Sequence, residues 1–204
     1  MRIETVSFDS VMLYFGDEIS EEVLDHVQSA YTSLKSLANI IDLTPSYTSI
    51  LLQYDIFYYD TSDIQKVIIT HLSKFKNIAL KKGKEICIEV DYSQGLDLQR
   101  VADFNQLSIE EVIQVHSAQR YRVYAVGFMV GFAYLAKVPS SIQTPRLETP
   151  RAKVPKGAVA LAQTQTAIYP QASSGGWNIL GHTDFNDFDS FEIGDSVRFI
   201  DVSL

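Results

Sequence analysis

The sequence predicts a mixed α+β domain at the N-terminal end of the chain, followed by a domain built mainly of β-strands. Residues 1–82 contain strand, helix, strand, strand and helix patterns, whereas short strand-like runs dominate residues 85–204. The segment 81–84 (KKGK) interrupts the apolar pattern between the two parts. Five of the six prolines and six of the ten glycines lie in residues 121–183, which is typical of strands joined by shaped loops.

The first part begins with two strand-like runs, residues 2–8 and 11–15, and then predicts a helix. Ser20 is a residue type that caps helices, and the acidic residues Glu21 and Glu22 complement the helix dipole in the first turn. Apolar residues recur at helical spacing from Val23 to Leu37. We therefore expect a helix that starts directly after Ser20.

Two short β-branched runs follow, residues 39–45 and 47–55, and then a second helix is predicted to open at residues 61–63. Two helices that cover one face of a small, mostly antiparallel sheet form an α+β sandwich of the ferredoxin-like type. We expect this ferredoxin-like domain to span residues 1–83.

The second part begins with a strand at residues 85–91 and continues with two short helices, at about 97–105 and 109–118. The second helix starts with Ser108 and Glu111 in the register of a capping box. Beyond it the pattern is all β, and the segments on either side of Gly194 predict a final hairpin. Many short strands at close spacing predict an all-β domain, a barrel or a sandwich, over residues 84–204.

Composition excludes several classes of function. The formal net charge of -8 opposes nonspecific binding to nucleic acid, which depends on phosphate neutralisation. The single cysteine, Cys87, rules out an intrachain disulfide, and we expect it to be a buried apolar residue. The N-terminus lacks the apolar run of a signal peptide, and no apolar stretch is long enough to span a bilayer. We expect a cytoplasmic protein that binds neither nucleic acid nor membranes.

Arg146 and Arg151 each follow a Thr-Pro dipeptide, so the same short pattern occurs twice within eight residues. A guanidinium group presents a planar fork of donors that suits a carboxylate or a phosphate, and the proline before it restricts the backbone. The two arginines are therefore candidates for binding an anionic ligand. The alternative is a salt bridge with the surplus acidic residues.

Other polar residues offer weaker candidates. Gln165 and Thr166 carry neutral donors and acceptors that suit an amide or lactam, or they are ordinary strand residues with satisfied hydrogen bonds. His116 is a candidate general base because an unperturbed histidine titrates near neutrality; otherwise it is a structural residue at a helix end. The remaining histidines show no metal-ligand spacing, and no P-loop or serine-elbow motif is present. We expect no metal site and no ATP bound by this chain alone.

A set of aromatic residues could form the wall of a pocket. Its members are Phe128, Phe132, Tyr134, Tyr169 and Trp177. Aromatic side chains in β domains belong more often to the core, and we expect at least two of these five to do only that.

Several separate motifs, in one order from residue 47 to residue 199, resemble the bacterial KipI family, also called allophanate hydrolase subunit 1. They are YTSILLQYD (47–55), EEVIQVHSAQRYRVYAVGF (110–128), GFAYL (131–135), TPRLETPRAKVPKGAVALA (144–162), QTAIYP (165–170), GGWNILGHT (175–183) and GDSVRF (194–199). The resemblance implies a small α/β domain followed by a cyclophilin-like β-barrel domain.

The resemblance also implies a function and partners. It implies the B component of a 5-oxoprolinase, which uses ATP to open 5-oxo-L-proline to L-glutamate together with a KipA-type C component and an A component. The substrate carries a carboxylate, which gives Arg146 and Arg151 a specific expected ligand. The alternative within the family is a KipI-like protein that inhibits a sensor histidine kinase by direct contact.

The chain departs from the family pattern at five positions, which leaves the exact amide substrate open. Val130 and Ser174 stand where the family usually has proline, Gln163 and Ala167 replace usual glycines, and His182 replaces a frequent arginine.

Overall fold

The structure is a computed structural model that describes residues 1–74 and 83–203. The chain divides into two compact units, Met1–Lys82 and Gly83–Leu204. Lys81 and Lys82, which contribute to the expected boundary, lie outside the described residues. No helix in the described ranges is long and apolar enough to cross a membrane.

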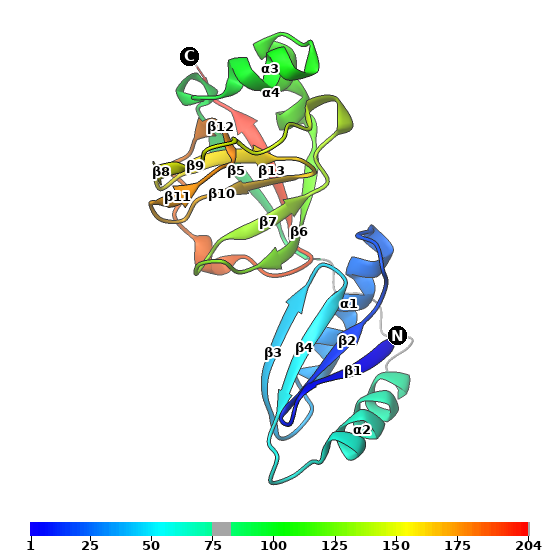
Figure 1. Cartoon of the computed structure of the whole chain (residues 1–204). Coiled ribbons are helices and arrows are strands. Elements are labelled where there is room, and N and C mark those ends of the chain that lie inside the picture. Colours follow the sequence, from blue (N-terminus) through cyan, green and yellow to red (C-terminus); the bar gives the residue numbers. More distant parts are fainter. Residues whose placement is uncertain (75–82, 204) are drawn as a thin grey trace. The chain divides into compact units, whose positions relative to one another are not determined.

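The first unit contains one four-stranded antiparallel sheet and two helices (Figure 1). The strand order in the sheet is β1-β2-β4-β3. The elements, in chain order, are β1 (Arg2–Ser7), β2 (Ser10–Tyr14), α1 (Glu21–Leu34), β3 (Ile40–Ser46), β4 (Ser49–Tyr54) and α2 (Thr61–Lys74). The first unit is therefore mixed α/β, as the sequence predicts.

Local sequence signals determine where these helices begin. The Ser20 side chain accepts a hydrogen bond from the Val23 amide at 3.2 Å, which satisfies one of the free donors at the start of α1. The apolar stripes of α1 and α2 are buried, together with alternate residues of β2 and β4. The fully buried residues of this unit include Val11, Leu13, Leu24, Val27, Ile50, Leu52, Ile64 and Ile68.

The second unit is built around a seven-stranded sheet that curls into a nearly closed barrel (Figure 1). Its strand order is β12-β9-β10-β7-β6-β13-β5, and a separate two-stranded ribbon pairs β8 with β11. The strands are β5 (Glu85–Val90), β6 (Arg120–Val126), β7 (Ala133–Ala136), β8 (Arg151–Val154), β9 (Ala158–Ala162), β10 (Gln165–Ile168), β11 (Ser173–Gly175), β12 (Asn178–His182) and β13 (Ser196–Asp201). A bridge between Asp91 and His182 joins the two edge strands.

Two helices lie at one end of this barrel, α3 (Leu98–Asn105) and α4 (Ile109–Ala118) (Figure 1). Both were expected, and the capping box at Ser108 and Glu111 is present in full. Single-turn 3₁₀ helices occur at η1 (Tyr92–Gln94), η2 (Ser140–Ile142) and η3 (Phe188–Ser190). The second unit is therefore a mixed α/β structure, and the all-β description is too narrow.

Two expectations about the second unit are wrong. No hairpin forms within the described residues 185–201, because β13 pairs in parallel with β5 and antiparallel with β6, while the segment before Gly194 contains η3. Cys87 is exposed rather than buried. Strand β5 alternates between its two faces, and Ile88 and Val90 on the opposite side enter the core, with the partly buried Ile86 packed against it.

The curled sheet carries apolar packing on both faces. Along β9, Val159 and Leu161 enter the barrel core, whereas the alternate residues Ala158, Ala160 and Ala162 belong to a second cluster on the other face. That outer cluster also contains Phe132, Val154, Tyr169, Trp177 and Ile179. The small alanine side chains leave room there for large aromatic rings, and this outer face holds the candidate site.

Candidate functional site

The structure brings five of the expected site residues together on the outer face of the barrel. We call this group the arginine–aromatic face; it consists of Tyr134, Arg146, Arg151, Tyr169 and Trp177. The guanidinium carbon of Arg146 lies 5.7 Å from the centre of the Trp177 ring. The Arg146 side chain is exposed, and it has no ion-pair partner among the described residues. A cation that is both exposed and held near an aromatic ring can bind an anion from solvent.

Phe132 is the centre of the aromatic packing beneath this face. Its ring makes edge contacts with those of Tyr134, Tyr169 and Trp177 at centroid distances of 4.9, 5.4 and 5.8 Å. Phe132, Tyr169 and Trp177 are each at most 5% exposed. These three rings are therefore mainly core residues, and Tyr134 is the ring of this group with more access to solvent.

The two tyrosines of the face keep their protons at neutral pH. Burial raises the pKa of the Tyr169 hydroxyl above its ordinary value, and the positive charge of Arg146 partly opposes this increase. Burial raises the pKa of Tyr134 in the same way, again against the charge of Arg146. Both phenols therefore stay protonated beside a guanidinium group.

Arg151 differs from Arg146 because it already holds a carboxylate. Its Nη2 donates to Oδ1 of Asp97 at 2.7 Å, in an ion pair whose acid is almost fully buried. Its Nη1 is buried without a hydrogen-bond partner among the described residues. The salt-bridge alternative thus applies to Arg151, whose positive charge also acts to lower the pKa of Tyr169.

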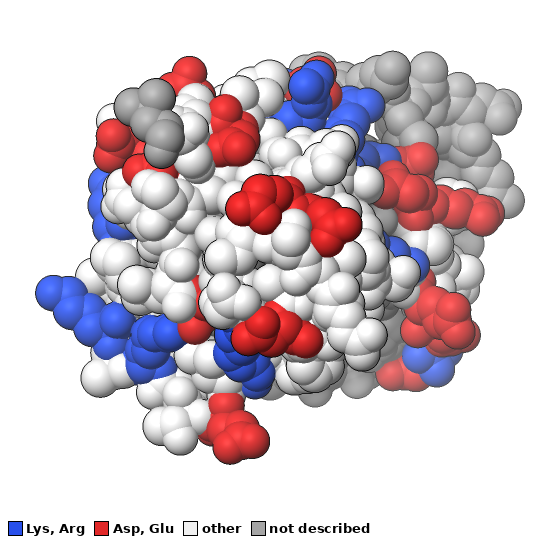
Figure 2. Space-filling view, turned by 90° about the horizontal axis from the view of Figure 1, so that it is seen from above, with Lys and Arg blue, Asp and Glu red and all other residues white. Residues whose placement is uncertain are grey.

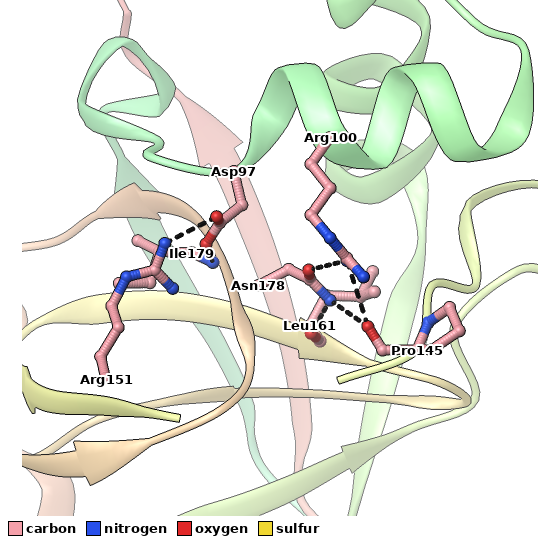
Figure 3. Close-up of polar contacts among 7 residues, drawn as sticks. All are labelled: Asp97, Arg100, Pro145, Arg151, Leu161, Asn178 and Ile179. Carbon is pink, nitrogen blue, oxygen red and sulfur yellow. Dashed lines mark hydrogen bonds and ion pairs between the residues drawn. The ribbon is translucent and has the colours of Figure 1, made fainter. Parts of the chain in front are cut away.

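Sequence reasoning missed the residues that hold this face together. Asp97 and Arg100 extend from the start of α3 toward the face (Figure 3). The second carboxylate oxygen of Asp97 accepts from the Ile179 amide at 2.6 Å. Arg100 donates to the Asn178 side chain and, at 3.2 Å, to the Pro145 carbonyl. The sequence contains one local sign of this network, which is Asn178, a polar residue within the apolar run of GGWNILGHT.

His116 lies inside the barrel core, on the opposite side of the sheet from the arginine–aromatic face. The Tyr92 hydroxyl donates to Nδ1 of His116 at 2.7 Å, and Nε2 donates to Thr166 Oγ1 at 2.9 Å. Thr166 in turn donates to the Ala160 carbonyl at 2.9 Å, which fixes the tautomer of the ring. The His116 ring stacks on Phe199 at 4.8 Å.

Burial without a compensating charge lowers the pKa of His116 to about 3. The side chain has no solvent exposure, and both ring nitrogens are already used. A general base must reach the proton that it removes. This geometry favours a structural role for His116, which is the alternative that the sequence left open.

Strand alternation separates the pair Gln165 and Thr166. The two residues are neighbours on β10, so their side chains point to opposite faces of the sheet. Thr166 contacts His116 in the interior, whereas Gln165 lies on the face that Ala167 shares with the aromatic cluster. Only Gln165 is on the side of the arginine–aromatic face.

Phe128 lies in a neighbouring loop and not in the face itself. It is 67% exposed, has a left-handed φ of 74°, and contacts Phe132 at 5.5 Å. An open hollow of about 570 Å³ lies between residues 126–131 and the side chains of Phe188 and Phe191. Phe128 thus connects this hollow to the aromatic cluster through Phe132.

Charge is mixed on the surface that Figure 2 shows, where acidic side chains lie between and beside the basic ones. That view shows no continuous basic area of the kind that binds nucleic-acid phosphates. In the described part of the chain, no three His, Cys, Asp or Glu residues are grouped so that they could hold a metal ion.

The model of the family described as "Carboxyltransferase domain, subdomain C and D" matches residues 1–195. The chain is 31% identical to the 5-oxoprolinase B component of Bacillus subtilis, over 99% of this chain and 93% of that protein. It is 43% identical to the protein of the same name from Haemophilus influenzae, over 58% of this chain and 60% of that protein.

Among solved structures, the chain is similar to the protein TTHA0988, with a TM-score of 0.83 and 32% identity over 97% of this chain. The matched region is 41% of TTHA0988, so the chain spans about two fifths of that protein. A conserved uncharacterized protein of Pyrococcus horikoshii, PH0987, is 36% identical over 99% of this chain and 98% of its own length, with a TM-score of 0.57.

The urea amidolyase of Kluyveromyces lactis shares the fold, with a TM-score of 0.71 over 96% of this chain and 14% of that protein, at 14% identity. The family match covers nearly the whole chain, and the similarity to the Bacillus subtilis protein extends from end to end. The chain therefore belongs to the carboxyltransferase domain, subdomain C and D family, which it shares with proteins named as the B component of 5-oxoprolinase.

Proposed function

We propose that this chain is the B component of an ATP-dependent 5-oxoprolinase that opens 5-oxo-L-proline to L-glutamate. The observation that carries the proposal is the set of three curated relatives with that name, at 31% to 43% identity. In this proposal the chain works in the cytoplasm with a KipA-type C component and an A component, and ATP is used by the complex rather than bound by this chain alone.

The arginine–aromatic face is the proposed substrate-binding surface. Arg146 is exposed, and it binds the carboxylate of 5-oxoproline, for which its guanidinium fork is suited. The partly exposed Tyr134 ring, which packs against the buried Trp177 ring, provides apolar surface for the five-membered lactam ring. The hydroxyls of Tyr134 and Tyr169 stay protonated and add polar character to this surface.

Arg151, Gln165 and Phe128 have secondary roles in this proposal. The buried Nη1 of Arg151 supports the bound anion while Nη2 stays on Asp97. Gln165 adds a neutral donor and acceptor at the edge of the face, and Phe128 extends the apolar surface through Phe132. His116 and Thr166 stabilise the barrel core, so the groups that break the lactam bond come from the assembled complex.

We interpret the first unit as a variant of the ferredoxin-like sandwich. In a ferredoxin-like sheet, one edge strand comes after the second helix of the motif. Here that edge position is taken by β1, which comes before the first helix, and the sheet order is β1-β2-β4-β3. We interpret the second unit as a cyclophilin-like barrel with α3 and α4 at one end. The boundary in this interpretation lies at residue 83.

The test is ATP-dependent release of glutamate from 5-oxoproline, with this chain, the KipA-type component and the A component combined and each omitted in turn. The proposal predicts that glutamate release requires this chain. Undiminished release without it would reject the proposal. The same purified chain should then be added to a sensor histidine kinase, because loss of autophosphorylation would support the inhibitor alternative.

A further inference from the structure

The network around α3 brings together two features of the chain that are far apart in sequence. Asp97 and Arg100 lie at the start of one helix, and their contacts reach both Thr-Pro-Arg segments. Asp97 holds Arg151 directly, whereas Arg100 holds the carbonyl of Pro145, the residue before Arg146. Figure 3 shows the two side chains extending from α3 toward these separate targets.

Asp97 occupies the N-cap position of α3, but its carboxylate does not cap the helix. Its two oxygens instead accept from Arg151 Nη2 and from the Ile179 amide. An aspartate at an N-cap ordinarily stabilises its own helix by accepting from the next turn. Here the Asp97 side chain instead links the start of α3 to β8 and β12, and it holds the Arg151 side chain in position.

The loop that carries Arg146 is held by hydrogen bonds on both sides of that residue. On one side, the Pro145 carbonyl accepts from Arg100 Nη1 and from Asn178 Nδ2 at 3.2 and 3.0 Å. On the other side, the Leu147 amide donates to the Gly176 carbonyl at 2.8 Å. The Thr144 carbonyl also accepts a hydrogen bond from the Gln163 amide at 2.8 Å. Arg146 is therefore an exposed side chain on an immobilised backbone.

We propose that Asp97 and Arg100 are positioning residues that hold Arg146 and Arg151 in place for binding the substrate carboxylate. This inference rests on the proposed function for the identity of the ligand, but the positioning itself does not depend on it. A preorganised cation binds an anion more tightly because less ordering is needed at the moment of binding. Asn178, which is fully buried, is the common acceptor and donor that joins Arg100 to the loop.

Trp177 reports on this positioning directly. It is the only tryptophan in the chain, it is 5% exposed, and it lies between Gly176, which binds Leu147, and Asn178, which binds Arg100. Quenching of its fluorescence by acrylamide therefore measures how tightly the loop covers the ring. This readout needs neither substrate nor the other components of the complex.

The test compares Arg100→Ala, Arg100→Lys and the control Arg120→Ala, each in the full chain. We expect Arg100→Ala to increase acrylamide quenching of Trp177 about twofold, because the Pro145 carbonyl and Asn178 each lose a charged donor. Arg100→Lys should give partial rescue, since one nitrogen, Nη1, makes both contacts. Arg120 is an exposed arginine of β6 that pairs with Glu85 at 3.2 Å, and its substitution should leave quenching unchanged.

The same variants are then assayed in the assembled complex. We expect Arg100→Ala to raise the KM for 5-oxoproline about tenfold with a smaller change in kcat, because the carboxylate is a binding group that does not react. Unchanged quenching in a folded Arg100→Ala protein would overturn the inference. If Arg100→Ala does not fold, Arg100→Met, which keeps the aliphatic stem but has no donor, takes its place, and wild-type quenching with an unchanged KM in that variant would overturn the inference. A complex inactive even with wild-type chain would reject the proposed function, and the fluorescence result would still decide the positioning role.

Discussion

At the scale of single residues, the clearest case is His116, whose surroundings determine what it can do. The ring is fully buried between Phe199 and Tyr121, and its two nitrogens bond to Tyr92 and Thr166. The sequence identified this histidine, but Tyr92 and Thr166 lie 24 and 50 positions away along the chain. A local sequence pattern cannot identify hydrogen-bond partners at such separations. The choice between a general base and a structural histidine therefore required the three-dimensional structure.

This environment predicts how stability depends on pH. In the unfolded chain, His116 gains a proton near its ordinary pKa of 6.5, whereas in the fold burial lowers the pKa to about 3. Between these values the unfolded state binds more protons, so stability falls as pH decreases from about 6.5 toward 3. This contribution is fully present above 6.5, and its slope is at most about 1.4 kcal/mol per pH unit.

The measurement is the free energy of unfolding by urea at several pH values for the wild type, His116→Gln and His26→Gln. His116→Gln should be less stable than the wild type at pH 7, and the difference should shrink as the pH is lowered. His26→Gln, at an exposed position of α1, should follow the wild-type curve. A stability difference between His116→Gln and the wild type that is the same at all pH values would contradict this account of the buried histidine.

Residue-scale geometry also explains two departures from the family pattern. Gln163, in place of a usual glycine, has a φ of 53°, in the left-handed region where glycine is unstrained. Its amide donates to the Thr144 carbonyl at 2.8 Å, which ties the turn between β9 and β10 to the loop that carries Arg146. His182 bridges to Asp91 through its backbone, so the arginine that is frequent there is not needed for closing the barrel.

At the scale of elements, helices and strands with local signals were predicted well. Ser20 and Ser108 mark the starts of α1 and α4 because a capping side chain bonds within its own first turn. The final hairpin was predicted wrongly, since β13 finds its parallel partner β5 more than a hundred positions earlier. Turn residues at Gly194 suggested a local pairing, but parallel partners leave no such mark in sequence.

The ribbon of β8 and β11 gives a prediction about the glycine pair before Trp177. A β-carbon on Gly175 would overlap the Tyr169 hydroxyl, whereas on Gly176 the nearest atom would be 3.6 Å away. Neither glycine has a left-handed φ, so the comparison depends on packing alone. Gly175→Ala should destabilise the chain by about 1 to 3 kcal/mol through overpacking, and Gly176→Ala by less than about 0.5 kcal/mol.

Urea unfolding of the two variants tests this difference, and Trp177 fluorescence shows whether the aromatic rings have moved. We expect a shifted emission maximum for Gly175→Ala alone. Equal stability of the two variants would show that the Tyr169 side chain moves aside with no loss in the free energy of unfolding. The close packing of β11 on this ring would then not contribute to stability.

At the scale of the whole molecule, the sequence was sufficient to predict the mixed α/β character of the chain. It also brought out the resemblance that the family match supports over residues 1–195. The candidate site residues combine two sets that lie on opposite sides of one curled sheet. Thr166 on β10 points inward to His116 of α4, whereas Arg146 and Trp177 lie on the outer side.

The two arginines with the same local pattern have different surroundings in the fold. Arg151 is neutralised in large part by Asp97, whereas Arg146 is exposed over Trp177. This difference arises from α3, which reaches the first arginine's backbone and the second arginine's side chain. The repeat of Thr-Pro-Arg alone gave no reason to distinguish them.

In the proposed 5-oxoprolinase complex, Arg146 binds the carboxylate of the substrate. The most direct measurement is ATP-dependent glutamate release by the complete complex, with wild-type chain, Arg146→Ala or the control Arg120→Ala. Arg146→Ala should raise the KM for 5-oxoproline by about tenfold or more, because a charged hydrogen bond to the carboxylate is lost. Arg120→Ala should match the wild type. Unchanged KM and kcat in Arg146→Ala would contradict the claim, and the substrate carboxylate would then have to bind elsewhere.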